Sequence, residues 1–147
     1  MTFYVIYDGD CNLCVSFTQL LAQVDRGHQF RYLPMQDKEG LSQFDVTAED
    51  CALGMILING SNPLERWQGS DAAEEIARRL PLGDWLIQAY RALPGAKAWG
   101  DKSYEQIRDR RYDWFGKRQT TYHAPYPFGC AGVDASINPN NNQQTCE

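Results

Sequence analysis

The sequence lacks the run of about 20 apolar residues that a membrane-spanning helix needs. It begins without the basic region and cleavage site of a secretory signal, so a cytoplasmic location is expected. It also lacks a basic excess, because 14 lysines and arginines stand against 19 aspartates and glutamates, whereas a phosphate-binding surface needs positive charge. No glycine-rich phosphate loop is present. We therefore expect no membrane or nucleic-acid partner and no organic cofactor.

The five cysteines are too few and too irregularly spaced for a disulfide framework, and an odd number cannot pair completely within one chain. One pair, Cys11 and Cys14, has the spacing Cys-x-x-Cys. In a reducing compartment this spacing indicates redox catalysis or metal binding. Zinc needs four ligands, and the sequence has no second Cys-x-x-Cys and no His-x-x-x-His. The scattered candidates for further ligands are Cys51, Cys130, Cys146, His28 and His123. Redox chemistry is the leading interpretation, a metal site and an inert pair of thiols are the alternatives, and we predict no metal.

Apolar patterning predicts the element order βαβ-α-ββα over residues 1–81. Residues 3–7 are apolar on both faces, which is typical of a buried strand, and residues 11–25 repeat apolar side chains at helical spacing. A strand over 29–33, a short helix within 36–50, a hairpin over 53–58 and 63–67, and a helix capped by Ser70 or Asp71 follow. This α/β order is that of the thioredoxin fold in its compact, glutaredoxin-like form, which places a Cys-x-x-Cys at the start of the first helix.

Two further segments follow the predicted thioredoxin-like domain. Residues 82–118 are expected to form a helical extension packed on it, with the tryptophans and tyrosines of its second half in the core. The basic residues from Arg108 to Arg118 alternate with acidic ones, which favours a solvated helix face over a docking site for an acidic partner. Residues 119–147 are rich in Pro, Gly, Asn and Gln, so an irregular, flexible tail is expected.

Residues 7–14, Tyr-Asp-Gly-Asp-Cys-Asn-Leu-Cys, resemble the N-terminal motif of the DCC family of thiol-disulfide oxidoreductases. The resemblance continues at residues 69–73, Gly-Ser-Asp-Ala-Ala, and at 110–116, Arg-Arg-Tyr-Asp-Trp-Phe-Gly. It covers about residues 3–118 and implies a thioredoxin-like fold and a redox activity without naming a substrate. One departure concerns the cis-proline that better-known thioredoxins carry before the third strand, where it helps to dock substrate. Residues 49–54 contain no proline, and Cys51 lies there instead.

The motif assigns candidate roles to three residues. Cys11 is predicted to be the nucleophile, because it is usually the more exposed cysteine of such a pair and because a helix N-terminus lowers a thiol pKa. Cys14 would resolve the mixed disulfide, which leaves a redox-active Cys11–Cys14 bridge. Asp8 would take the proton of Cys14, or would merely turn the backbone with Asp10. Cys51 is a third redox thiol or a small buried hydrophobe.

The predicted function is therefore thiol–disulfide exchange on a protein or a small-molecule thiol or disulfide. An external reductant, such as glutathione or a reductase, would close the cycle. The alternative is a non-catalytic binding module that uses the thioredoxin-like fold for protein contacts. Cys130 and Cys146 lie in predicted loops and are expected to be spectator thiols or a tail disulfide.

Overall fold

The computed structural model describes residues 2–81 and 83–128 of the chain. The elements are β1 (Phe3–Tyr7), α1 (Asn12–Asp25), β2 (Phe30–Pro34), α2 (Lys38–Ser42), α3 (Ala48–Ala52), β3 (Ile56–Asn59), β4 (Arg66–Gln68), α4 (Ser70–Arg79), α5 (Gly83–Ala92) and α6 (Ala96–Phe115). This order confirms the predicted α/β, thioredoxin-like class with C-terminal helices. None of the helices in the described ranges is long and apolar enough to cross a membrane.

The four strands form one mixed sheet in the order β2-β1-β3-β4. β1 and β2 are parallel, as a strand–helix–strand unit requires, whereas β3 runs antiparallel to both β1 and β4. The register pairs Val5 with Tyr32 on one side and with Leu57 on the other. β1 therefore lies inside the sheet, which explains its continuous apolar sequence.

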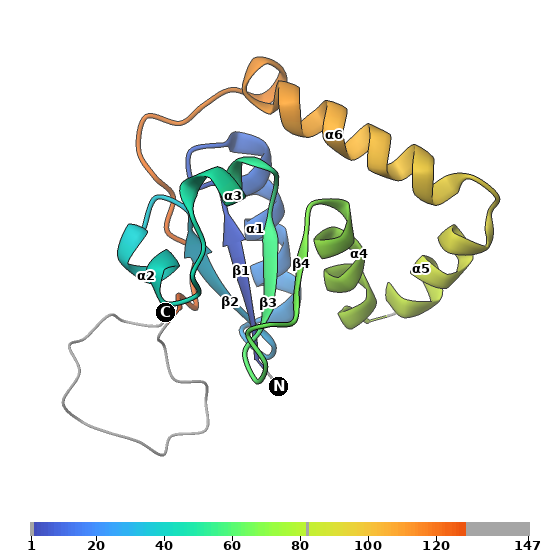
Figure 1. Cartoon of the computed structure of the whole chain (residues 1–147), viewed down its shortest axis with the longest axis horizontal. Coiled ribbons are helices and arrows are strands. Elements are labelled where there is room, and N and C mark those ends of the chain that lie inside the picture. The colour runs from blue at the N-terminus through green and yellow to red at the C-terminus, as the bar shows by residue number, and fades with distance from the viewer. Residues whose placement is uncertain (1, 82, 129–147) are drawn as a thin grey trace.

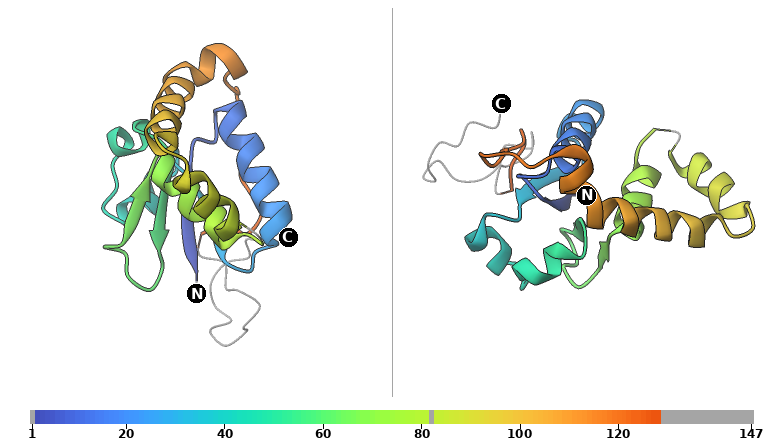
Figure 2. Two further views of the ribbon diagram at one scale, coloured as in Figure 1. Left: turned by 90° about the vertical axis from the view of Figure 1, so that its right-hand side faces the viewer. Right: turned by 90° about the horizontal axis from the view of Figure 1, so that it is seen from above.

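Helices cover both faces of this sheet (Figures 1 and 2). Phe3, Val5 and Tyr7 of β1 face α1 and α4 in one buried cluster. Ile6, on the opposite face, belongs to a second cluster with residues of α2 and α3. Burial of an aliphatic or phenylalanine side chain of this kind contributes about 1.5–3 kcal/mol, so the two clusters hold the layers together.

α6 runs across the edge of the sheet at which β1 ends and α1 begins (Figure 1). It contains no buried residue among those described, and Trp99 and Trp114 are 72% and 51% exposed. The prediction that the aromatic residues of this region form core is thus wrong for Trp114 and for Tyr112, which is 36% exposed. Trp114 lies in the last turn of α6, where about half of its surface remains exposed to solvent.

The chain after α6 returns along the loop that carries the motif. We call residues 116–124 the strap. Its Arg118 N–H donates to the Asp10 carbonyl at 2.6 Å, and its Tyr122 N–H donates to the Gly9 carbonyl at 2.9 Å. The Tyr7 hydroxyl donates to the Tyr122 carbonyl at 2.7 Å. Most of the strap belongs to the segment predicted as an irregular tail: it is irregular, but it is bonded to the motif loop. Cys130 and Cys146 lie outside the described residues.

The start of α4 differs from the prediction that Ser70 or Asp71 caps this helix. Gly69 is the N-cap, with φ 64°, and no side chain bonds the helix end. Ser70 instead donates to Asp101 of α6 at 2.6 Å, and Asp71 accepts from Lys97 at 2.7 Å. Both side chains therefore tie α4 to α6, which local sequence signals do not reveal.

Candidate active site

Cys11 is the N-cap residue of α1. The Asp8 carboxylate accepts the N–H of Asp10 at 3.0 Å, and this turn carries the chain from β1 to the helix. Cys11 is extended, with φ −91° and ψ 120°, so that its Sγ accepts the N–H of Cys14 at 3.4 Å. The sulfur thus occupies the position of a capping oxygen, where negative charge is favoured by the free N–H groups of the first turn.

The two thiols have opposite pKa shifts. A hydrogen bond from the Cys14 thiol is the largest of the effects that lower the pKa of Cys11 to about 6; burial opposes it, and two backbone N–H groups and the charge of Arg111 reinforce it. The same hydrogen bond, together with burial, raises the pKa of Cys14, which is the donor. The predicted lowering at Cys11 is confirmed. At neutral pH the pair holds a thiolate on Cys11 and a proton on Cys14.

Exposure of the two cysteines is the reverse of the prediction. The Cys11 side chain has no exposed surface, whereas Cys14 is half-buried. The backbone of the strap lies beside Cys11, which forms an isolated antiparallel bridge with Lys117, and the Asn12 N–H donates to the Gly116 carbonyl at 3.3 Å. The expectation that Cys11 is the more exposed thiol is therefore wrong, because a segment distant in the sequence covers it.

The Asp8 side chain is buried and well partnered. Besides the Asp10 N–H, it accepts the Gln36 amide at 2.9 Å and the Tyr112 hydroxyl, and it pairs with Arg111 at 3.4 Å. Its negative charge also contributes to the raised pKa of Cys14. The backbone-turning role of Asp8 is thus present, and its place beside Cys14 leaves the proton-transfer role as a proposal.

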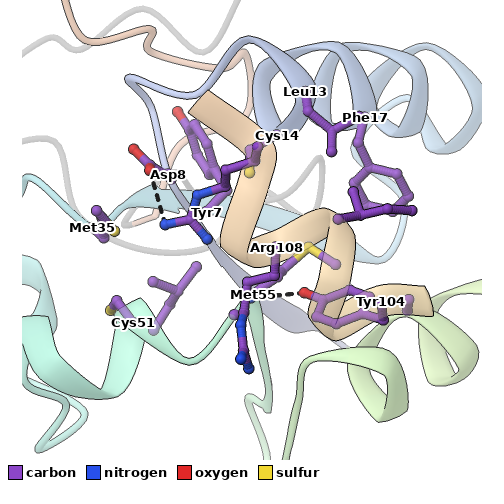
Figure 3. Close-up of a pocket in the computed structure, with 15 residues that line it drawn as sticks. Tyr7, Asp8, Leu13, Cys14, Phe17, Met35, Cys51, Met55, Tyr104 and Arg108 are labelled. Carbon is purple, nitrogen blue, oxygen red and sulfur yellow. Dashed lines mark hydrogen bonds and ion pairs between the residues drawn. The ribbon is translucent and has the colours of Figure 1, made fainter. Parts of the chain in front are cut away.

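A cavity of about 240 Å³ opens between α1, α6 and the sheet edge (Figure 3). Its walls are mainly apolar. They include Leu13, Phe17, Met35, Met55 and Ile107. Of the two motif cysteines, Cys14 is the one found among the described residues that line the cavity. Asp8 and Cys51 line the same cavity, so two of the three predicted site residues and the additional cysteine share one space.

Cys51 lies on α3 and belongs to the buried cluster on its face of the sheet. Burial, followed by the charges of Asp50 and Asp8, raises its pKa to about 11. A thiol with this pKa stays protonated at neutral pH and is a poor nucleophile. These properties favour the interpretation of Cys51 as a small buried hydrophobe.

Four residues of α6 contribute to the site although the sequence interpretation placed the basic ones on a solvated face. Arg111 and Tyr112 hold Asp8. Arg108 donates to the Leu53 carbonyl at 3.1 Å, and the Tyr104 hydroxyl accepts the N–H of residue 55 at 3.3 Å. The exposed fractions of the Arg108 and Arg111 side chains are 22% and 11%, so the solvated-face prediction is wrong for both. Their spacing from Tyr104 of four and seven residues, which keeps one helix face, is the signal that could have found them.

Carboxylates with the spacing of metal ligands come together within the described ranges. The grouping found there is Asp71, Glu74 and Asp101. Lys97 Nζ lies 2.7, 2.8 and 2.9 Å from these three carboxylates and already supplies a cation to them. The motif cysteines are not part of this grouping, so it gives no support to a zinc site built on them.

A mixed four-stranded sheet with a Cys-x-x-Cys pair at the N-terminus of its first helix, one thiol of which has a lowered pKa, defines the class of thioredoxin-like thiol–disulfide oxidoreductases. The chain belongs to the DCC1-like thiol-disulfide oxidoreductase family, whose model matches residues 5–117. Comparison with curated proteins and with solved structures gave no match. The family match confirms the resemblance stated above and identifies the protein as an oxidoreductase of thiols and disulfides.

Proposed function

We propose that the protein exchanges electrons with thiol and disulfide substrates through Cys11 and Cys14, which alternate between a dithiol and a disulfide. The observation that carries this proposal is the hydrogen-bonded pair, in which one sulfur is a thiolate with a pKa of about 6 and the other keeps its proton. A low-pKa thiolate is a good leaving group, so a bridge between these sulfurs opens readily.

Access favours a different assignment of the two roles from the one that the motif predicts. Disulfide exchange requires an open approach to the sulfur under attack. Cys14 lines the cavity, whereas Cys11 is covered. We therefore assign Cys14 as the sulfur that bonds the substrate and Cys11 as the sulfur that leaves from, and re-forms, the bridge.

The cycle that oxidises a thiol substrate has three steps. A substrate thiolate attacks Cys14 of the Cys11–Cys14 disulfide, the S–S bond breaks, and Cys11 leaves as a thiolate. A second substrate thiolate attacks the substrate sulfur of the mixed disulfide, which releases the oxidised product, and Cys14 takes up a proton. An external disulfide restores the bridge. In the opposite direction Asp8 takes the proton of Cys14, and the resulting Cys14 thiolate attacks a substrate disulfide and releases one half of it as a thiolate. Cys11 then displaces the other half from Cys14, and glutathione or a reductase reduces the bridge.

Asp8 is the group that we propose carries the proton of Cys14. It lines the same cavity as Cys14, and its other contacts hold the carboxylate in place. When Cys14 reacts as a thiolate, a neighbouring carboxylate provides a route for the proton that Cys14 loses.

A redox titration tests this function. The reduced protein is equilibrated in glutathione buffers, and the free thiols are alkylated and mapped by mass. We expect a Cys11–Cys14 bridge with a midpoint between about −120 and −270 mV, the span of known exchange proteins. In Cys11→Ser the substrate should remain trapped on Cys14, and Cys51→Ser should behave as the wild type. A pair that never closes would contradict the exchange function and favour the binding-module alternative.

A further inference from the structure

Side chains of α6 occupy backbone N–H and C=O groups beside the cavity that an extended substrate peptide would otherwise need for pairing. The N–H of Met55 donates to the Tyr104 hydroxyl, and the carbonyl of Leu53 accepts from Arg108. Between them, Gly54 has φ +127°, and a Cβ placed there would lie 2.9 Å from the Tyr104 hydroxyl oxygen. Because strand addition depends on main-chain hydrogen bonds, an extended peptide could pair here only by displacing α6.

Most of the polar groups that line the cavity are also engaged; the exception among the described residues is the buried Nε of Arg111, which has no hydrogen-bond partner. Asp8 is paired with Arg111, Arg108 is bonded to a backbone carbonyl, and the Tyr104 hydroxyl is bonded to a backbone N–H. A substrate that enters therefore meets mainly apolar side chains. Met35 and Met55 are unbranched and adapt their shape to such ligands.

The size of the cavity limits its occupant. Its volume of about 240 Å³ lies below the roughly 300–1,000 Å³ of sites that hold drug-sized ligands. Burial of charged groups among apolar walls is unfavourable unless they find partners, so a charged tripeptide such as glutathione is a poor fit. Cys14 lies in the wall of this space and can bond a sulfur inside it.

We infer that the substrate bonded by Cys14 is a low-molecular-weight thiol with an apolar body, or its disulfide, held in the cavity between α1 and α6. This inference rests on the proposed function, because it names the substrate class of the same site. The chemistry is the exchange already described: the apolar thiol supplies the electron pair, the Cys11–Cys14 bridge is reduced, and an external disulfide reoxidises it.

A homologous series of symmetrical alkyl disulfides of increasing chain length tests the inference. The reduced protein is the electron donor, and each rate is divided by the rate of the same disulfide with a simple dithiol. About 0.8 kcal/mol per buried methylene corresponds to about a fourfold rise in relative kcat/KM for each carbon added. We expect this rise until the cavity is full and a fall beyond that length. Oxidised glutathione and a disulfide-bonded peptide should react more slowly than the best alkyl disulfide.

Two variants change the cavity in opposite directions. Ala73→Leu places a larger side chain in the cavity wall, which makes the cavity smaller, and should shift the optimum to a shorter chain. Ile107→Ala, at a half-exposed position where folding is not at risk, should shift it to a longer one. Ala98→Leu, on an exposed part of α6, is the matched control and should leave the optimum unchanged.

The outcomes separate this inference from the proposed function. If the Cys11–Cys14 bridge forms but the relative rates are independent of chain length, or if glutathione or the peptide is the best substrate, the apolar substrate class is wrong and the exchange function stands. If no disulfide reacts and the bridge never forms, the proposed function itself fails. An optimum that moves with Ala73→Leu and Ile107→Ala supports both.

Discussion

Replacement of Cys14 by alanine removes the thiol that donates a hydrogen bond to Cys11, the largest of the effects that lower the Cys11 pKa to about 6. A hydrogen bond to a charged group contributes about 1.5–3 kcal/mol, and one pKa unit corresponds to about 1.36 kcal/mol. The Cys14 N–H, 3.4 Å from the sulfur, belongs to the backbone and remains in the variant. We therefore expect the pKa of Cys11 to rise by about 1–2 units rather than to return fully to its ordinary value.

The corresponding loss of thiolate is large enough to measure. At pH 7 a thiol with a pKa of 6 is about 90% ionised, and a rise of 1–2 units reduces this to between about 50% and 10%. The assay is the pH dependence of the Cβ chemical shift of isotopically labelled cysteine in the reduced protein. Cys14→Ser keeps a hydroxyl donor and should shift the pKa less than Cys14→Ala. Cys51→Ala should not shift it, because Cys51 is not among the groups that perturb Cys11. Equal midpoints near pH 6 in the wild type and both Cys14 variants would refute the reasoning and assign the shift to the helix end alone.

Three further perturbations test the surroundings of the pair. Arg111→Met removes a charge that lowers the pKa of Cys11, so the same titration should give a higher midpoint for Cys11. The variant also removes the buried partner of Asp8, which should cost about 3–5 kcal/mol of stability. An unchanged midpoint would show that the charge of Arg111 does not reach the pair. The pKa of Cys11 in the folded protein lies below its unfolded value of about 8.5. Urea unfolding of the reduced protein should therefore show a stability that rises with pH between about 6 and 8.5, by at most about 1.4 kcal/mol per pH unit. This contribution is lost as the pH falls through about 6. An equal slope in Cys11→Ser would contradict that origin. Gly9→Ala places a Cβ 2.6 Å from the Thr121 methyl, which should displace the strap, cost about 1–3 kcal/mol of stability and speed alkylation of Cys11. Adding Thr121→Ser, which removes that methyl, should slow the alkylation again in part. An unchanged alkylation rate in Gly9→Ala would show that the strap does not control access to Cys11.

The parts of the fold that the sequence predicts are those determined by short stretches of chain. Residues 3–7 are apolar on both faces, and β1 is buried between two strands. The Cys-x-x-Cys pair follows that strand directly, so its place at the start of α1 needs no long-range information. The lowered pKa of Cys11 follows in direction from the same position, although its largest cause is the neighbouring thiol and not the helix end.

The parts that escaped prediction depend on contacts between distant segments. Tyr112 and Asp8 are 104 residues apart, and Tyr7 and Tyr122 are 115 residues apart. The strap has no apolar period that would indicate what it packs on, so its cover over Cys11 could not be inferred. The basic stretch of α6 has the composition of a solvated face, and only the stripe that includes Arg111 is turned toward the domain.

The strap has a consequence for the protein while it is being made. The Asn12 side chain donates to the carbonyl of Phe115, which directly precedes the strap and lies 103 residues later in the chain than Asn12. At a synthesis rate of about 5–20 residues per second, roughly 5–20 seconds pass between the appearance of the motif and that of its cover. Throughout this interval Cys11 is open to any oxidant or thiol reagent near the ribosome, and a group bonded to it then would occupy the space that the strap later fills. A chain can therefore complete the fold only if its Cys11 has stayed unmodified during translation.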